Sequence, residues 1–164
     1  PCPILQPNSN GIRLGEGATF FALSDTCSEQ TVAELLNVEI RYNLAPNEIE
    51  AFVSHFLAQS GYALTDIDLV ISGRGENQED RPFFDSFDNL FPSSPILIYK
   101  HLSGEFFTAS AIGLYLACKY NTLKGLPSIL QSYPERQLPR PSQYILLYNQ
   151  YLGKEHSLVL LRKK

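Results

Sequence analysis

Apolar and polar residues follow two different periods along the chain, and each period predicts one kind of element. Between Pro46 and Gly61, apolar residues recur three and four positions apart, which is the spacing of one face of an α-helix. Pro46 suits the first turn of that helix and Gly61 suits its end. At residues 38–42 apolar and polar residues alternate one by one, as in a half-buried strand. Short apolar runs such as 67–71 predict buried strands.

The complete series of elements predicts an α/β domain. Strands are expected at 18–23, 38–42, 67–71, 95–99, 144–149 and 156–161, and helices at 29–36, 46–60, 79–90 and 103–120. Strands that alternate with helices predict a mixed, mostly parallel sheet with helices on both faces. The last two strands flank Gly153 and predict an antiparallel hairpin, after a proline-rich connection over 127–141. We expect residues 1–164 to form a single domain.

Composition narrows the class of protein. The chain is 44% hydrophobic and 18% charged, which is an ordinary globular balance. A net charge of −4 argues against nucleic-acid binding, which usually needs a basic face. No apolar run approaches the roughly 20 residues of a membrane helix, and the sequence shows no signal-peptide pattern. We therefore expect a cytoplasmic protein that contacts neither nucleic acid nor a membrane.

The chemistry of cysteine and histidine predicts no metal, no disulfide and no cofactor. Cys2, Cys27 and Cys118 are odd in number and widely spaced, and the three histidines are scattered. Cys118 lies within an apolar helix, where core packing is favoured over reactivity. Cys27 lies near a predicted helix start, which can lower the pKa of a thiol, but an unreactive role is favoured there as well. Because the chain starts with Pro1 and contains no methionine, we expect it to be a piece of a longer protein or a processed product.

Three motifs occur in order, each beside a predicted element. Residues 3–18, PILQPNSNGIRLGEGA, end in Gly-Glu-Gly-Ala before the first apolar run. Residues 72–75, SGRG, follow the strand at 67–71, with Asp80 behind them. Lys100 follows the strand at 95–99 and precedes Gly-Glu and Ala-Ser-Ala at 104–105 and 109–111. The glycines of 72–75 do not complete a dinucleotide-binding G-x-G-x-x-G motif, so that interpretation is weak.

Together these motifs resemble the C-terminal half of the β-ketoacyl-(acyl-carrier-protein) synthases, which have a thiolase-like fold of two similar α/β halves. In that family G-E-G-A opens the segment, H-G-T-G-T precedes an aspartate, and K-S-x-x-G-H precedes A-A-G. The resemblance covers nearly the whole chain. It implies that the chain is the second half of a thiolase-like fold.

The departures from the family's pattern imply a degenerate site. The family's two histidines stabilise the enolate oxygen that forms when a malonyl-carrier protein is decarboxylated. The first falls at Ser72, a weaker donor, and the second at Glu105, whose carboxylate would repel an enolate. Lys100 is retained. The glycine-rich G-F-G-G-T-N gating loop aligns with residues 150–155, which include Tyr151 and have lost most of its glycines. The family's nucleophilic cysteine lies in its other half.

The resemblance therefore implies a non-catalytic ketosynthase-like subunit or half-domain in fatty-acid or polyketide biosynthesis, similar to a chain-length factor. The helix at 103–120 is apolar on nearly every side, and alone it would expose an apolar face. The expected partners are a missing N-terminal half, a second copy or a ketosynthase subunit, together with an acyl carrier protein. The alternative is a divergent 3-oxoacyl-ACP synthase, an acyltransferase whose cysteine lies upstream and which uses Lys100 and Glu105. A third interpretation is an interaction domain without any link to acyl chains.

Overall fold

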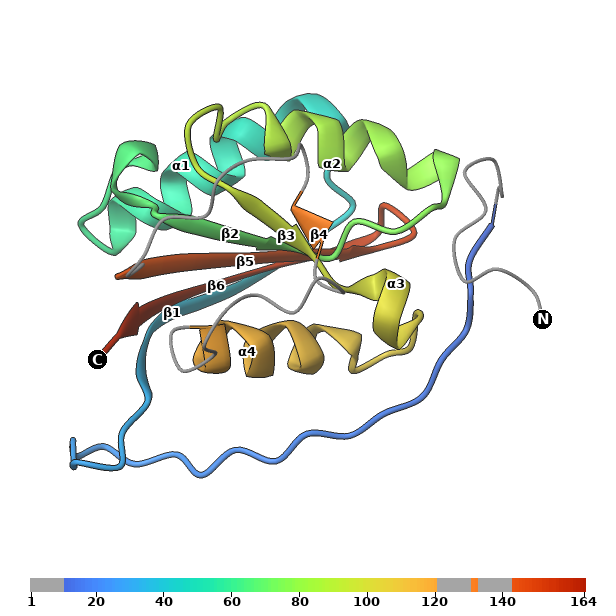
Figure 1. Ribbon diagram of the computed structural model, residues 1–164. Coiled ribbons are helices and arrows are strands. Elements are labelled where there is room, and N and C mark those ends of the chain that lie inside the picture. The colour runs from blue at the N-terminus through green and yellow to red at the C-terminus, as the bar shows by residue number, and fades with distance from the viewer. Residues whose placement is uncertain (1–10, 121–130, 133–142) are drawn as a thin grey trace.

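The computed structural model describes residues 11–120, 131–132 and 143–164, and a mixed sheet lies at its centre (Figure 1). Its strands are β1 (Ala33–Tyr42), β2 (Leu69–Ser72), β3 (Ile96–Ile98), β4 (Gln131–Ser132), β5 (Tyr144–Tyr151) and β6 (Glu155–Lys163). They lie in the order β1-β6-β5-β2-β3-β4. The mixed sheet confirms the prediction. The expectation of a mostly parallel sheet holds only at the centre, where β2 pairs with β3 and β5, because the other neighbouring pairs are antiparallel.

Helices cover both faces of the sheet, as predicted. α1 (Ile49–Gln59) and α2 (Arg81–Asp88) lie on one face. The short α3 (Lys100–Ser103) and α4 (Ala109–Lys119) lie on the other (Figure 1). None of the described helices has both the length and the apolar character needed to cross a membrane.

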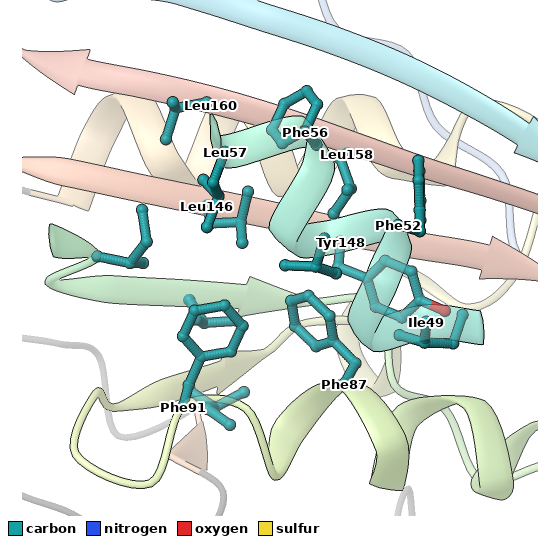
Figure 2. Close-up of a cluster of buried hydrophobic side chains, with 14 of the residues drawn as sticks. Ile49, Phe52, Phe56, Leu57, Phe87, Phe91, Leu146, Tyr148, Leu158 and Leu160 are labelled. Carbon is teal, nitrogen blue, oxygen red and sulfur yellow. The ribbon is translucent and has the colours of Figure 1, made fainter. Parts of the chain in front are cut away.

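Helix α1 forms because its apolar spacing matches the helical period. A 3₁₀ turn at Pro46–Glu48 precedes it, and the Glu48 carboxylate accepts a hydrogen bond from the Ala45 N–H at 2.7 Å. The helix buries its apolar face against the sheet and α2 (Figure 2), and this face consists of Ile49, Phe52, Val53, Phe56 and Leu57. Burying such a side chain contributes about 1.5–3 kcal/mol, so this cluster is a major source of stability. Gly61, at φ +79°, ends the helix as predicted.

Helix α4 approaches the sheet closely through small residues. Ala109, Gly113 and Ala117 are its buried positions. A Cβ atom on Gly113 would lie 2.8 Å from the ring of Tyr99 and 2.8 Å from Leu147. Such distances are shorter than van der Waals contact, so glycine at this position leaves the space that the Tyr99 ring occupies.

The helix expected at 103–120 is divided and shorter than predicted. α3 ends at Ser103, and Gly104 has φ +71°, a conformation that glycine adopts without strain. α4 begins only at Ala109. Within the described chain its outer side is not enclosed, because Tyr115 is 44% exposed and Phe107, just before the helix, is 92% exposed. Among residues 11–120, 131–132 and 143–164, this apolar surface is uncovered, and the expectation that a partner covers it stays a prediction.

Two predicted elements near the start of the chain are wrong. Residues 18–23 form no strand, and Phe20 and Leu23 there are 95% and 83% exposed. Residues 29–36 are not a helix, because β1 already begins at Ala33 and places Leu35 opposite Leu161 of β6. A short helix gains little from its own hydrogen bonds, whereas the long pairing with β6 provides tertiary contacts.

The other predicted elements within the described residues are present, with ends that differ by a few positions: the strands at 38–42, 67–71, 95–99, 144–149 and 156–161, and the helices at 46–60 and 79–90. The hairpin turns at Leu152 and Gly153, both with positive φ. Most of the proline-rich connection at 127–141, and the start of the chain at Pro1, fall outside the described residues.

We expect Gly113→Ala to lower the free energy of unfolding by about 1–3 kcal/mol, because the added methyl group forces the Tyr99 ring to move. Urea unfolding measures this loss, and Tyr99→Leu in the same chain should recover part of it. Gly75→Ala is the control, since nothing lies within 4 Å of a Cβ at Gly75. A Gly113→Ala chain as stable as the wild type would contradict the packing described for α4.

Candidate functional site

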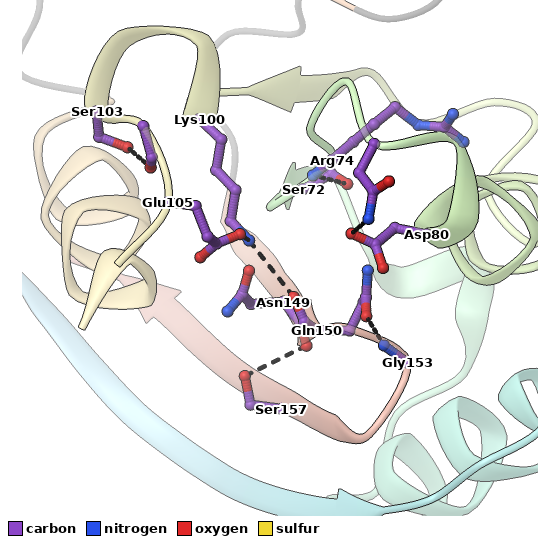
Figure 3. A network of polar contacts seen from close by, with 12 residues as sticks. Ser72, Arg74, Asp80, Lys100, Ser103, Glu105, Asn149, Gln150, Gly153 and Ser157 are labelled. Atoms are coloured by element: carbon purple, nitrogen blue, oxygen red, sulfur yellow. Dashed lines mark hydrogen bonds and ion pairs between the residues drawn. The ribbon is translucent and has the colours of Figure 1, made fainter. Parts of the chain in front are cut away.

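The candidate site lies where the carboxyl ends of three neighbouring strands meet. β2 ends at Ser72, Lys100 follows β3, and Gln150 is near the end of β5. Because β2 is parallel to both of its neighbours, these ends share one edge of the sheet. Ligand sites of open α/β sheets commonly lie at this edge. Figure 3 shows how the side chains gather there.

A buried ion pair joins Lys100 to Glu105. The Lys100 Nζ atom lies 2.5 Å from Glu105 Oε2, and the two side chains are only 5% and 12% exposed. Lys100 Nζ also donates to the Gln150 backbone oxygen at 3.4 Å. Burial lowers the pKa of Lys100, and the adjacent Glu105 carboxylate opposes that shift. The pair therefore links α3, the turn before α4 and the end of β5.

The Gly-Glu-Gly motif at residues 15–17 packs directly on the turn that contains Glu105. The Glu105 N–H donates to the Arg13 oxygen at 2.8 Å, and the Gly15 N–H donates to the Glu105 oxygen at 3.1 Å. A Cβ on Gly104 would lie 2.8 Å from the Gly15 nitrogen. Two motifs about 90 residues apart in the sequence are thus in backbone contact, which the order of the motifs alone did not reveal.

Ser72 does not join the ion pair. It is fully buried, and its hydroxyl oxygen accepts a hydrogen bond from the Arg74 N–H at 3.2 Å. Among the described residues, no hydrogen bond connects Ser72 to Lys100 or Glu105. Of the positions that the resemblance pointed to, the structure therefore brings together Lys100 and Glu105, and it leaves Ser72 in the turn after β2.

Tyr151 lies at the end of β5, next to the hairpin turn. Its ring centroid is 5.9 Å from that of the exposed Phe107, so the turn and the start of α4 are neighbours at the rim of the site. The turn is held by the Gln150 side chain, whose Oε1 accepts from the Gly153 N–H at 2.6 Å. The backbone in this position is a tight turn of three residues between the paired Tyr151 and Glu155, and not a glycine-rich loop.

Sequence reasoning missed two buried amides at the end of β5. Asn149 Oδ1 and Gln150 Nε2 are both buried, and neither has a hydrogen-bond partner among the described residues. The Asn149 side chain packs so closely on Gly73 that a Cβ atom on residue 73 would not fit. The Lys100 side chain also lies close to Gly73. The alternation of β5 sends these two side chains to opposite faces of the sheet. The glycine at 73 was the available signal, because a glycine in a strand-end turn often marks close approach.

A second missed feature is an ion cluster that fixes the turn after β2. Arg74 Nη2 lies 2.6 Å from Asp85 Oδ1 and 2.8 Å from Asp88 Oδ2, and its guanidinium also lies over the Phe84 ring. Burial raises the pKa of Asp88 to about 6, although Arg74 opposes that shift. This arrangement gives the SGRG segment a structural role, which replaces the weak dinucleotide interpretation.

Neither described cysteine belongs to the site formed by Lys100 and Glu105. Cys27 is exposed, and Cys118 lies within α4, where burial raises the pKa of its thiol. Within residues 11–120, 131–132 and 143–164, no group of three histidine, cysteine or carboxylate side chains converges on one point. Chemically, the site offers one ammonium group that is already paired with a carboxylate, and this pairing does not favour binding of a further anion.

Comparison with known proteins places this fold. No model of a protein family matches the chain, and no curated protein matches it either. Among solved structures, it is similar to a type II polyketide ketosynthase bound to its acyl-carrier protein (AntDE:AntF), with a TM-score of 0.64 and 14% identity over 80% of this chain and 38% of that one. The ketosynthase–chain length factor of PfaC also gives a TM-score of 0.64, with 16% identity over 85% of this chain and 14% of that one.

A third structure, 3-oxoacyl-[acyl-carrier-protein] synthase III from Aquifex aeolicus VF5, is similar with a TM-score of 0.51 and 16% identity, over 82% of this chain and 46% of that one. The chain therefore has the thiolase-like fold of the ketosynthases, as the sequence predicted. It spans less than half the length of each of these chains.

We expect Glu105→Leu to lower the free energy of unfolding by about 3–5 kcal/mol, because it leaves the buried ammonium group of Lys100 without a partner. The double variant Lys100→Met, Glu105→Leu should cost less than this single change, since neither charge then remains buried. Urea unfolding of both single variants and the double variant measures the coupling. Additive losses would show that the two side chains do not form a pair in solution.

The buried carboxyl of Asp88 should make stability depend on pH. Its pKa of about 6 in the folded state lies above the ordinary value of 3.8, so the folded state holds this proton more tightly. The resulting stabilisation is present at low pH and is lost as the pH rises through 6. Between pH 4.5 and 7, wild type should lose roughly 1–3 kcal/mol relative to Asp88→Asn, measured by urea unfolding. The control is Asp85→Asn, which removes the exposed carboxylate that Arg74 also contacts. Identical pH profiles for wild type and Asp88→Asn would contradict the raised pKa assigned to Asp88.

Proposed function

We propose that this chain is the C-terminal half of a thiolase-like fold and acts as a non-catalytic, chain-length-factor-like part of a fatty-acid or polyketide synthase. The observation that carries the proposal is the buried pair of Lys100 and Glu105. A carboxylate stands where the family's second histidine would be, and its negative charge opposes the enolate that decarboxylation requires. Ser72, at the first position, is occupied within its own turn.

The partner in this proposal is the other half of the fold, supplied by an N-terminal segment or by a ketosynthase subunit. The uncovered side of α4 supports this, because Tyr115 and Phe107 expose apolar surface there. The short share of the ketosynthase chains that this chain spans supports it too. An acyl carrier protein would meet the assembled pair in the cytoplasm, and no cofactor is needed for this role.

The alternative is a divergent 3-oxoacyl-ACP synthase whose cysteine lies in an upstream half. The buried Lys100 favours it, since an ammonium group with a lowered pKa can act in proton transfer. The pairing of Lys100 with Glu105 opposes this alternative, because the carboxylate already balances the charge of the ammonium group. We therefore give the non-catalytic role precedence.

The test incubates the purified chain with a malonyl-carrier protein and follows acetyl-carrier protein by mass spectrometry, with an active ketosynthase as the positive control. We expect no decarboxylation above the buffer rate, from the wild type or from Lys100→Ala. In a second assay, adding the chain to a ketosynthase that lacks its chain length factor should change the length of the product. Decarboxylation by the wild type that is lost in Lys100→Ala would overturn the proposal in favour of the enzyme.

A further inference from the structure

Two tyrosine rings lie in contact at the end of the sheet away from Lys100 and Glu105. Tyr62 follows α1, and Tyr144 begins β5, whose other end carries the candidate site. The ring centroids are 4.7 Å apart and the interplanar angle is 48°, which is at the short end of the distance range typical of aromatic pairs. The pair therefore lies outside the candidate site.

Backbone hydrogen bonds position both tyrosines. The Tyr62 N–H donates to the Leu57 oxygen at 3.0 Å, which ties this residue to the last turn of α1. The Tyr144 N–H donates to Asp68 Oδ2 at 2.9 Å, and the Tyr144 oxygen accepts from the Asp68 N–H at 3.0 Å. The fold therefore brings the two rings together, although they are far apart in the sequence.

The hydroxyl ends of the two rings also meet. A side-chain hydrogen bond to Tyr144, followed by burial, raises the pKa of Tyr62, so the Tyr62 O–H is the donor and the Tyr144 oxygen is the acceptor. Arg162 forms a side-chain hydrogen bond to the same Tyr144 hydroxyl, and its guanidinium pairs with Glu34 at 2.5 Å. Because the two oxygens meet, the ring carbons next to them are neighbours as well.

Two phenols in this arrangement can be joined by oxidation. A phenol that loses one electron and one proton becomes a radical, and its unpaired electron is shared between the oxygen and the ring carbons next to it. Two such radicals on neighbouring rings form a carbon–carbon bond between those carbons, and the hydrogen that each carbon carried moves to its oxygen. In total the two tyrosines lose two electrons and two protons, which reduce one hydrogen peroxide to two waters.

We propose that Tyr62 and Tyr144 are a site of oxidative modification, at which hydrogen peroxide acting through a haem peroxidase joins them as dityrosine. Both rings are partly buried against the core beneath α1 and α2 and partly exposed, so each can lose an electron to an external acceptor while it stays beside the other. The new bond ties the end of α1 to the start of β5. It closes a loop of about 80 residues, which lowers the conformational entropy of the unfolded chain. The proposal depends on this contact and not on the proposed function.

The experiment treats the dilute chain with a haem peroxidase and hydrogen peroxide, reduces any disulfides, and measures the intact mass of the monomer. We expect the wild-type monomer to lose two hydrogen atoms, and peptide fragmentation to place the bond between Tyr62 and Tyr144. Tyr62→Phe and Tyr144→Phe should each abolish it, because phenylalanine keeps the ring but forms no phenoxyl radical, and circular dichroism checks their fold. Tyr42→Phe is the matched control, since Tyr42 is 62% exposed and its loss should leave the bond intact. A wild-type monomer without the mass loss, or a bond that persists in Tyr62→Phe, would overturn the proposal.

Two further measurements distinguish a bond set by the fold from random coupling. In urea that unfolds the chain before oxidation, the yield of the bond within the monomer should fall, because the rings then meet only by chance. The cross-linked wild-type monomer should unfold at a higher urea concentration than the untreated chain, whereas treated Tyr62→Phe should not shift. An equal yield from the unfolded chain would refute the role of the ring contact, and an unshifted midpoint in the wild type would refute the tie between α1 and β5.

Discussion

The contact between a buried ammonium group and a buried carboxylate governs the arrangement of this protein's strand ends. Lys100 leaves the end of β3, and with almost no water around it, its charge must be met inside the protein. Glu105 meets it, which fixes the turn between α3 and α4, and the backbone of the same residue holds the segment at Arg13 and Gly15. A single residue therefore joins three parts of the chain, and its charge also decides what chemistry this edge of the sheet can support.

The two faces of the sheet are stabilised in different ways. On the α1 and α2 face, aromatic and branched side chains form a thick apolar layer, with Phe87 stacked on Tyr148 at a centroid distance of 4.2 Å. On the α4 face, the helix is nearer the strands, and Gly113 gives up its side chain so that Tyr99 fits. On the first face, the core side chains are buried by other described residues. On the second face, Tyr115 of α4 and the preceding Phe107 stay exposed among the described residues.

Most of the fold could be predicted from periodicity, because the elements with strong internal patterns are also those that the core buries. The helix at 46–60 and the final hairpin are examples. The errors lie at residues 18–36, where an apolar composition suggested a buried strand and a helix. Neither could be judged locally, since β1 exists only through its pairing with β6, and Phe20 and Leu23 in the run at 18–23 are exposed. At the site, the motifs located Lys100 and Glu105 but did not reveal that the two form an ion pair. The ion pairs of Arg74 with Asp85 and Asp88 depend on tertiary contacts that the spacing of residues in the sequence does not encode.

The pairing of β1 with β6 has a consequence for how the chain folds. Ala33 lies opposite Lys163, so the partners of this strand are separated by 130 residues. Loop closure over such a distance is slow, and β1 can join the sheet only after β6 has emerged from the ribosome. Until then the long edge of β1 and the apolar run before it remain unprotected. The first strand within the described residues is thus among the last to dock, and the interval before it docks is when these residues are most open to aggregation.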